Sequence, residues 1–292
     1  MTELPARWST LQRYKNHLLY GLIRLLFGEV QLLPLRVATA IARLLGHLAP
    51  HLARRDTARA QRHVQQALQL PRQQARRLTR AMYVHLAQNA VETAHLDKLD
   101  IVLPQAAKDT LDAALAQGKG VVAVTGHIGN WELLAQAVAQ SGYPISTVAK
   151  PLYDPRLTAW VNTWRTARGL QIIWRGQNPK AMLRVFRQGG ILAFLMDQDT
   201  KVPGAFVPFF GRPAFTPTAP AILALRTGAP IVVGFHRRVG STHTLTIEPH
   251  PFVANGDFEQ DMIELTAQLT ARLENIIRAA PEQWVWLHKR WR

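Results

Sequence analysis

Hydrophobic and polar positions change their period along the chain, and this change predicts two regions. Residues 11–27 place leucines and a tyrosine at helical spacing with basic residues largely on the other side. Gly28 is expected to end this helix, and Pro34 can open a second amphipathic helix that runs to Leu48. A further helix is predicted from Pro71 to about Asp97. From about residue 101, short apolar runs and helical patterns alternate instead.

The alternating region is typical of an α/β fold. Val121 to Val124 is a short continuous apolar run of the kind that is buried in parallel sheets, and Asp197 to Pro217 is a long Gly/Pro-containing segment. The predicted strands are 121–125, 145–149, 171–174, 190–196 and 230–236, with a possible partner at 243–248. The predicted helices are 105–118, 130–141, 155–168, 178–188, 218–227 and 257–279.

We therefore expect a mixed, largely parallel central sheet flanked by helices, with an N-terminal amphipathic helical segment. Residues 1–100 are interpreted as a helical, membrane-associating region packed on the core, and residues 101–292 as the α/β core. The two parts are expected to form one structural domain.

Composition narrows the possible partners. Lys and Arg number 35 against 19 Asp and Glu, which gives a formal charge of +16. The expected partners are therefore anionic: nucleic acid, an acidic carrier protein or an anionic membrane surface. Residues 54–80 are densely basic but contain no aromatic side chain on which bases could stack, so a basic nucleic-acid-binding protein stays as the alternative from another class. The absence of Cys excludes a disulfide framework, a thiolate nucleophile and a Cys-based metal site.

The N-terminal region predicts association with a membrane surface. A spanning helix needs about 20 nearly uninterrupted apolar residues, whereas the stretch 18–48 carries four charged residues, Arg24, Glu29, Arg36 and Arg43. The N-terminus also lacks the pattern of a cleaved signal peptide. An amphipathic helix backed by cations is typical of an interfacial anchor, although an ordinary surface helix has a similar composition.

The first candidate for chemistry is a histidine and a glutamate that flank the end of the strand 121–125. His127 follows this strand in a turn that Gly126 and Gly129 allow to bend tightly. Asn130 is a natural helix N-cap, so Glu132 falls in the first helical turn. Glu132 could then accept a hydrogen bond from one imidazole nitrogen and leave the other to take a proton from a hydroxyl. A packed strand end is the alternative interpretation.

Other chemistries lack their motifs. The chain has no Gly-x-Ser-x-Gly nucleophile turn, which disfavours a serine hydrolase. It also lacks the glycine-rich phosphate-binding loops of nucleotide and dinucleotide sites. No cofactor and no metal site are therefore expected.

Further motifs accompany the Thr125–Glu132 segment in a fixed order. They are Asp197-Gln198-Asp199, Phe206 to Ala214, Thr216-Pro217, Leu223 to Pro230 and Pro281 to His288. With these motifs the chain resembles the bacterial lipid A biosynthesis acyltransferases of the late, lauroyl/myristoyl type, within the wider lysophospholipid and glycerolipid acyltransferases. The resemblance covers roughly residues 10–292.

This resemblance implies a membrane-associated O-acyltransferase at the cytoplasmic face of the inner membrane. It would move a fatty acyl chain from an acyl carrier protein or coenzyme A thioester, used as co-substrate, to a lipid hydroxyl. The motifs favour a lipid A precursor as acceptor; lysophospholipids, ornithine lipids and glycolipids remain alternatives. His127 would be the general base oriented by Glu132, and the backbone N–H groups of Gly129 and Asn130 are candidate donors to the oxyanion.

Five residues form the expected substrate-binding set. Arg165 matches an arginine of the family and is expected to contact phosphate or help bind acceptor or donor, unless it is an exposed helix residue. Asp197 and Asp199 end a buried strand, where a carboxylate must be paired or functional. They are expected to organise the acceptor side or to pair with an arginine. Asn130 and Arg212 complete the set.

Two further segments carry expectations. Residues 200–212 are expected to form an ordered active-site loop. The C-terminal Trp284 and Trp286 are expected to pack against the sheet, although tryptophans among cations also suit a contact with lipid headgroups.

Overall fold

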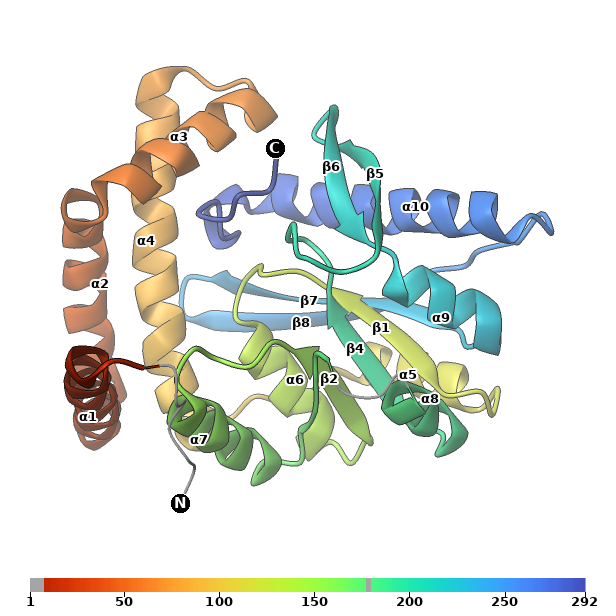
Figure 1. The fold of residues 1–292 in the computed structure, drawn as a ribbon, viewed down its shortest axis with the longest axis horizontal. Coiled ribbons are helices and arrows are strands. Elements are labelled where there is room, and N and C mark those ends of the chain that lie inside the picture. Colours follow the sequence, from red (N-terminus) through yellow and green to blue (C-terminus); the bar gives the residue numbers. More distant parts are fainter. Residues whose placement is uncertain (1–7, 177–179, 292) are drawn as a thin grey trace.

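The computed structural model of the protein describes residues 8–176 and 180–291. Within them the chain forms a six-stranded sheet in the order β3-β2-β4-β1-β7-β8 with helices on both faces (Figure 1). Neighbouring strands are parallel except β7 and β8, which are antiparallel. The strands are β1 Val121–Thr125, β2 Ile145–Ala149, β3 Gln171–Trp174, β4 Ile191–Leu195, β7 Ile231–Val239 and β8 Thr242–Pro249. The predicted α/β fold with a mixed, largely parallel sheet is confirmed.

The helices follow the predicted alternation in the second part of the chain. They are α1 Thr10–Leu32, α2 Leu35–Leu52, α3 Arg54–Leu68, α4 Arg72–Ala94, α5 Gln105–Leu115, α6 Trp131–Gln140, α7 Pro155–Thr166, α8 Lys180–Arg187, α9 Ala219–Thr227 and α10 Phe258–Ala279, with short 3₁₀ turns η1 Leu96–Lys98 and η2 Pro281–Gln283. The first residues of the predicted helix 178–188 lie outside the described residues.

Side chains alternate between the two faces of the sheet and bury a separate apolar layer on each. On one face, Val121 and Ile191 pack against Leu111 of α5 and Val138 of α6. The other face packs on α9 and α10 and continues into α3 and α4. Because helices cover both faces, the central strands β1 and β4 are hydrophobic almost throughout, as the run Val121–Val124 predicted.

Two neighbouring strands set the position of the functional site. β1 and β4 pair in parallel, with Thr125 opposite Leu195. The residues that follow the two strands therefore leave the sheet side by side at its carboxyl-terminal edge, where open α/β sheets place their ligands. His127 follows β1, and Asp197 follows β4.

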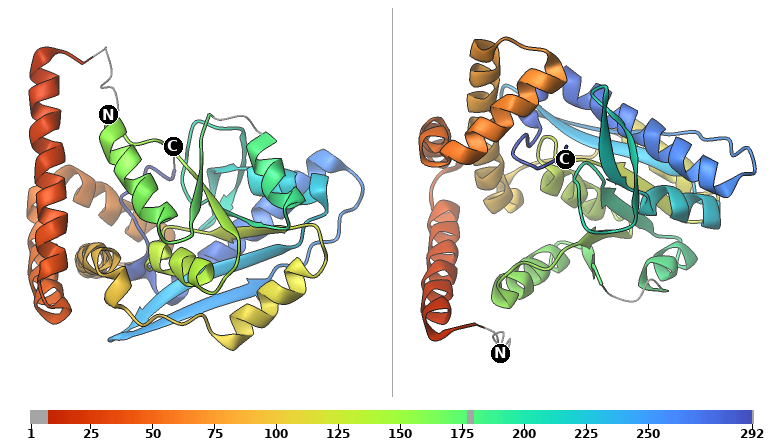
Figure 2. Two further views of the ribbon diagram at one scale, coloured as in Figure 1. Left: turned by 90° about the horizontal axis from the view of Figure 1, so that it is seen from below. Right: turned by 45° about the horizontal axis from the view of Figure 1, so that its top comes forward.

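The N-terminal helices form a layer beside the sheet, and α1 extends along one side of the molecule (Figure 2). The expected helix end at Gly28 is wrong, because α1 continues to Leu32. A glycine inside a helix costs only about 1 kcal/mol, which the surrounding helix-forming leucines offset. α1 contacts the core through its aromatic side chains: Phe27 packs edge-on against Trp160 of α7, with ring centroids 4.8 Å apart.

The Gly/Pro-containing segment 197–217 contains a β-hairpin, β5 Gly204–Phe209 and β6 Arg212–Pro217, so most of the loop expected at 200–212 is a strand and a tight turn. Its two-residue turn places both Phe210 and Gly211 at positive φ, 52° and 71°, as tight hairpin turns require. A half-buried carboxylate on α10, Glu274, accepts a hydrogen bond from the Phe210 backbone N–H. Gly and Pro residues therefore lie at the ends and in the turn of two short strands. The hairpin packs on α10.

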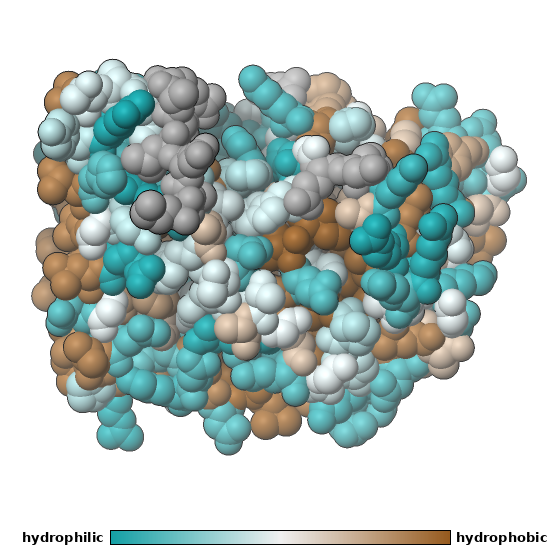
Figure 3. Space-filling view, turned by 60° about the horizontal axis from the view of Figure 1, so that its bottom comes forward, coloured by the Kyte–Doolittle hydropathy of each residue, from teal (hydrophilic) through white to brown (hydrophobic). Residues whose placement is uncertain are grey.

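An apolar surface remains uncovered on α1 and α2. Its members are exposed and include Leu11, Leu18, Leu22, Leu25, Leu32, Ile41, Leu44, Leu45, Leu48 and Leu52. Figure 3 shows hydrophobic residues along the left edge of the molecule, the side on which α1 and α2 lie in Figure 1. Among residues 8–176 and 180–291, no helix combines the length and the hydrophobicity that crossing a membrane requires.

Gly46 allows α2 to lie directly on α4, since a Cβ atom added there would be 2.6 Å from the Val84 Cα atom. We predict that Gly46→Ala lowers the free energy of unfolding by about 1–3 kcal/mol, the usual cost of overpacking. Gly21→Ala in α1 is the matched control, because an added Cβ meets nothing within 4 Å there. The control should be neutral or gain up to about 1 kcal/mol from helix propensity. Urea unfolding of both variants measures the difference, and equal effects would contradict this account of the α2–α4 contact.

Candidate active site

The imidazole of His127 is held by the carboxylate of Asp197. Asp197 Oδ1 accepts from His127 Nδ1 at 2.7 Å, and Oδ2 accepts from the His127 backbone N–H at 2.7 Å. Trp284 Nε1 also donates to Oδ2, at 2.7 Å. Since a carboxylate only accepts, the proton of a neutral His127 ring lies on Nδ1, and Nε2 carries the lone pair.

Asp197 remains ionised although it is buried. Burial acts to raise the pKa of its carboxyl group, but the charge of His127 and the hydrogen bonds from His127 and Trp284 outweigh burial and hold the pKa below its ordinary value. The close packing has a second consequence at Gly126, where an added Cβ would come within 3.1 Å of Asp197 Oδ2. Gly126 thus lets the turn approach the carboxylate.

The contact predicted between His127 and Glu132 is not the one that the structure contains. Glu132 instead forms a two-point ion pair with Arg165, in which Arg165 Nε donates to Oε2 at 3.0 Å and the second nitrogen, Nη2, donates to Oε1. Glu132 lies in the first turn of α6, and α7 brings Arg165 against it across the sheet edge. The carboxylate that orients the imidazole therefore comes from the next strand of the sheet.

His127 Nε2 lies beside two further polar side chains. The Gln198 amide nitrogen is 3.0 Å from His127 Nε2 and 2.7 Å from His288 Nε2. Burial is the main cause that lowers the pKa of His288 to about 4, so this imidazole is neutral at physiological pH. As a neutral ring, His288 can accept one amide hydrogen of Gln198, and the other amide hydrogen then faces His127 Nε2.

A cavity of about 950 Å³ opens beside these groups, and His127, Glu132, Arg165 and Gln198 lie in its wall. Most of the lining is apolar. One part lies against the sheet face under α6, and another reaches the opposite face near α8 and α9. The small side chains of the first part are Ala123, Thr125, Thr147, Ala149 and Ala193; the second part includes Val148, Met182, Leu183, Phe194 and Ile222. Lys150, Arg175 and Arg226 add positive charge to the wall.

The expected oxyanion donors are already engaged. The Gly129 N–H donates to the Gln283 carbonyl at 2.9 Å, and the Asn130 N–H donates to His236 Nδ1 at 2.8 Å. The expectation that these two groups stabilise an oxyanion is therefore wrong for this structure. The C-terminal segment engages the Gly129 N–H, because this segment pairs with the turn through an antiparallel bridge between Ile128 and Trp284.

The remaining residues of the expected substrate-binding set lie apart from the cavity wall or at its margin. Asn130 is buried and caps α6, with its Oδ1 accepting from the Leu133 N–H at 3.2 Å, as predicted. Asp199 lies between Gln198 and Thr200 of the lining, and its charge acts on Arg290.

Arg212 begins the second strand of the hairpin and contacts helix α3 and the C-terminal segment. Its Nη1 donates to Gln66 Oε1 at 2.6 Å, and its guanidinium lies 5.3 Å from the centre of the Trp291 ring. These contacts give Arg212 a place outside the cavity wall.

Three residues at the site carried no predicted catalytic role: Gln198, Trp284 and His288. Each belongs to a motif noted in the sequence. The motifs therefore marked these residues, but they did not indicate that the side chains contact Asp197 or His127. The expectation that Trp284 and Trp286 pack against the sheet is confirmed, since both are buried beside Phe209 and Phe210 in the apolar layer on one sheet face. Among residues 8–176 and 180–291, no group of three or more metal-ligating side chains is arranged to hold a metal ion.

The fold and the site define an α/β protein with a carboxylate-held histidine at the wall of an apolar cavity. The chain belongs to the family described as bacterial lipid A biosynthesis acyltransferase, whose sequence profile matches residues 8–292. This family membership confirms the resemblance inferred from the motifs.

Individual relatives extend the comparison. The chain is similar to a phosphatidylinositol mannoside acyltransferase of Mycobacterium tuberculosis, with 28% identity over 187 residues, 63% of this chain and 58% of that protein. It is 25% identical over 300 residues to a lipid A biosynthesis acyltransferase of Haemophilus influenzae, covering 98% of this chain and 90% of the relative. A lipid A biosynthesis lauroyltransferase of Escherichia coli is 29% identical over 181 residues, 61% of this chain and 58% of the relative. The chain thus spans less than two thirds of the first and third of these proteins.

Acidification is predicted to destabilise the fold. Burial is the main cause that lowers the pKa of His85 to about 3 and of His236 to about 2. Between these values and 6.5 the unfolded chain binds protons that the folded chain does not, so stability rises with pH in that window and falls on acidification. From pH 6.5 to 5 each histidine should remove roughly 2 kcal/mol, at about 1.36 kcal/mol per pKa unit. Urea unfolding at pH 7 and pH 5 measures this, and equal free energies would contradict it.

Proposed function

We propose that this protein is an O-acyltransferase that moves a fatty acyl chain from a thioester to a hydroxyl group of a membrane lipid. The observation that carries the proposal is the imidazole of His127, with Nδ1 held by Asp197 and Nε2 at the wall of a large apolar cavity. A base needs one nitrogen fixed and the other free to accept a proton. The apolar wall supplies the environment that a hydrocarbon chain prefers.

The reaction follows from these groups. His127 Nε2 removes the hydroxyl proton of the acceptor as its oxygen attacks the thioester carbonyl, and a C–O bond forms. The tetrahedral intermediate then expels the sulfur with cleavage of the C–S bond, and His127 returns the proton to the departing thiolate. Asp197 stabilises the imidazolium between these two steps. The backbone donors of the turn are engaged by other parts of the fold. The Gln198 amide hydrogen at His127 Nε2 is instead released when the acceptor hydroxyl takes its place there, so it is our candidate for the donor to the oxyanion.

The ion pair of Glu132 and Arg165 is proposed to bind the charged end of a substrate. Glu132 fixes the planar guanidinium at the cavity wall, and a fixed guanidinium suits a phosphate oxygen in two-point geometry. Lys150, Arg175 and Arg226 add cationic groups in the same wall. A phosphate accompanies the thioester in both acyl carrier protein and coenzyme A, so either donor fits this arrangement.

A lipid A precursor is the acceptor that we propose. The family and the relatives from Haemophilus influenzae and Escherichia coli, which are named for lipid A biosynthesis, support it. The mycobacterial relative, named for acylation of phosphatidylinositol mannoside, supports a glycolipid as the second candidate. Incubation of the purified protein with acyl thioesters and each acceptor, followed by mass spectrometry of the lipids, distinguishes them.

The uncovered apolar surface of α1 and α2 is proposed to lie on the cytoplasmic face of the inner membrane. Hydrophobic side chains on these helices face outward, and the neighbouring α3 and α4 expose Arg54, Arg55, Arg62, Arg72, Arg76, Arg77 and Arg80. Apolar burial and attraction to anionic lipids together give stable interfacial binding. This position would present the cavity to lipid acceptors while the protein stays peripheral.

The catalytic assignment predicts different kinetic effects for two carboxylates. His127→Ala and Asp197→Asn should lower kcat by about 10²- to 10⁴-fold, because the first removes the base and the second loses its orientation. Glu132→Gln should raise KM more than it lowers kcat, because Arg165 loses its partner. Steady-state kinetics on folded variants, checked by circular dichroism, measure these effects. Full activity of His127→Ala would overturn the proposed function, and a pure kcat loss in Glu132→Gln would return the orienting role to Glu132.

The membrane assignment predicts that Leu18→Asp, Leu22→Asp and Leu25→Asp weaken binding to anionic vesicles by at least about tenfold each, since a buried leucine contributes roughly 1.5–3 kcal/mol. Val253→Asp is the matched control, because Val253 is 91% exposed but lies away from α1 and α2. Vesicle co-sedimentation measures the binding. Equal losses for the control and the leucine variants would place the membrane surface elsewhere.

A further inference from the structure

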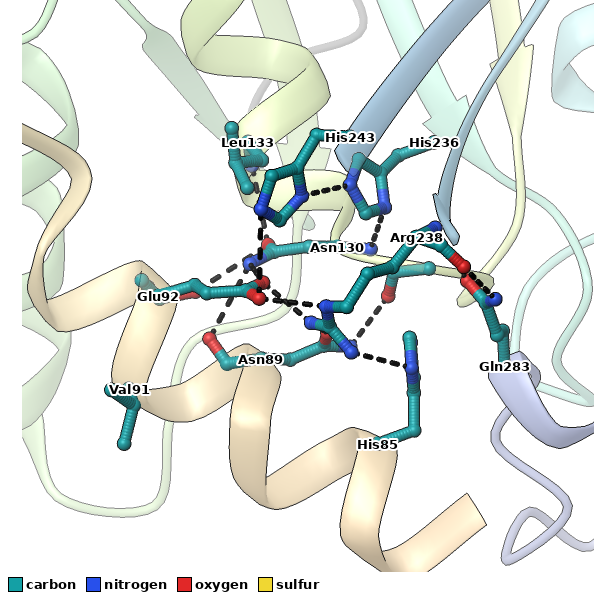
Figure 4. Close-up of polar contacts among 12 residues, drawn as sticks. His85, Asn89, Val91, Glu92, Asn130, Leu133, His236, Arg238, His243 and Gln283 are labelled. Carbon is teal, nitrogen blue, oxygen red and sulfur yellow. Dashed lines mark hydrogen bonds and ion pairs between the residues drawn. The ribbon is translucent and has the colours of Figure 1, made fainter. Parts of the chain in front are cut away.

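A buried polar network surrounds Asn130 at the end of the turn that follows His127, and the reaction described above does not use it (Figure 4). Its members come from four parts of the chain: α4, the start of α6, the β7–β8 pair and the C-terminal segment. They are His85, Asn89, Glu92, Asn130, His236, Arg238, His243 and Gln283.

An ion pair between α4 and β7 forms the centre of this network. Arg238 donates through Nε to Glu92 Oε1 at 2.7 Å and through Nη2 to Asn89 Oδ1 at 2.6 Å. A third nitrogen, Nη1, lies 2.7 Å from His85 Nδ1. Arg238 and Glu92 are 9% and 7% exposed. Since the desolvation of two buried charges often exceeds their attraction, stability alone gives a weak reason for this pair.

The contacts of the network converge on the turn that follows His127. Asn89 Nδ2 donates to the Gly129 carbonyl at 2.6 Å. Gln283 accepts from the Gly129 N–H through its backbone carbonyl, and its side chain exchanges two hydrogen bonds with the Arg238 backbone, at 2.9 and 2.7 Å. Asn130 Nδ2 donates to Glu92 Oε2 at 3.2 Å. Both peptide groups of the turn are therefore held from outside it.

The contact with His236 also assigns the protons in this part of the network. Because the Asn130 backbone N–H can only donate, His236 Nδ1 is the acceptor, and a neutral His236 carries its proton on Nε2. Nε2 then donates to His243 Nδ1 at 2.8 Å. The proton of His243 consequently lies on Nε2, which faces Glu92 Oε1 at 3.8 Å. The Asn130 N–H at one end and the Glu92 carboxylate at the other thus favour a single tautomer for both imidazoles.

The turn is packed against His236 without space between them. Gly129 has φ of +60°, and a Cβ added there would lie 2.1 Å from the His236 carbonyl oxygen and 2.5 Å from Nδ1. The sequence pattern indicated that Gly129 lets the turn bend. The structure shows that Gly129 is also needed because a side chain there would clash with His236.

We propose that His236 is a positioning residue for the transfer reaction, which sets the His127 imidazole by accepting the Asn130 N–H. Asp197 fixes the ring of His127, and His236 fixes the backbone N–H three residues after it. The inference rests on the proposed function, because it assigns His127 as the base. Misplacement of a reacting group by about 1 Å can cost about 10²-fold in rate.

Two variants of His236 separate positioning from a merely structural role. The side-chain oxygen of Asn can occupy the place of Nδ1 and accept from Asn130, whereas Gln reaches the place of Nε2 and leaves that N–H without its acceptor. Both remove the ring from the same buried site, so comparable losses in melting temperature are expected. Changing Glu92 is a poorer test, because it leaves Arg238 buried without its counter-ion.

The experiment measures steady-state acyl transfer to a lipid A precursor for wild type, His236→Asn and His236→Gln. In parallel, proton NMR of protein with labelled histidine detects the Nδ1–H of His127 in its hydrogen bond to Asp197, assigned by its loss in His127→Ala. His236→Asn should keep kcat within about threefold of wild type together with the NMR signal. His236→Gln should lower kcat by about 100-fold with little change in KM, and its signal should shift or broaden.

Each other outcome bears on one of the two proposals. Equal kcat losses in the Asn and Gln variants, or an unchanged His127 signal in His236→Gln, would overturn the positioning role. A signal that changes only in His236→Gln, in a protein whose wild type transfers no acyl chain, would support positioning and contradict the proposed function.

Discussion

The carboxylate of Asp197 is the interaction on which the site depends. It is buried, and three N–H groups, two from His127 and one from Trp284, donate to its two oxygens. A buried carboxylate without these donors would carry a large desolvation cost, so the ends of β1 and β4 and the C-terminal segment are held together by it. The same hydrogen bonds place the proton of His127 on Nδ1 and leave Nε2 directed at the cavity. The Asp197 side chain therefore both holds the three segments together and fixes the tautomer of His127.

The turn that carries His127 is constrained from both sides. Gly126 lets it approach Asp197, and Gly129 lets it approach His236. Between these contacts, the main chain of Gly129 and Asn130 is fully engaged by α4, β7 and the C-terminal segment. A catalytic imidazole on a loop needs this kind of support, since loops are otherwise the most mobile parts of a fold. In our proposal, this support is the role of the buried ion pair of Glu92 and Arg238 beside the turn.

The cavity and the outer surface both place apolar side chains beside cationic ones. Small side chains such as Ala123 and Ala193 on the sheet leave room beneath α6, and cations lie in the wall beside His127. Outside, α1 and α2 present leucines to the surroundings while α3 and α4 present arginines. An apolar compartment beside cationic groups suits an amphiphilic substrate both in the cavity and at the surface. Part of the excess of basic residues therefore lies in the cavity wall and on the exposed faces of α3 and α4.

The sequence by itself determined the alternation of strands and helices, the turn around His127, the Asn130 cap and the family. These features depend on local periodicity, on glycine and capping residues, and on short motifs. It also indicated that Asp197 had to be paired or functional, because it ends a buried strand. Local patterns were less decisive where an alternative structure uses the same residues: the glycines and prolines of 197–217 also suit a tight hairpin, and Gly28 is tolerated inside a helix.

Tertiary structure decided which carboxylate meets the imidazole. Glu132 is five positions from His127, and Asp197 is seventy. The parallel pairing of β1 with β4 nevertheless brings Asp197 to the His127 ring, whereas Glu132 pairs with Arg165 of α7. It also decided that the N–H groups of Gly129 and Asn130 are engaged and that Arg212 contacts Gln66. Strand order and the packing of distant helices set these contacts, and neither is encoded in the spacing of residues along one segment.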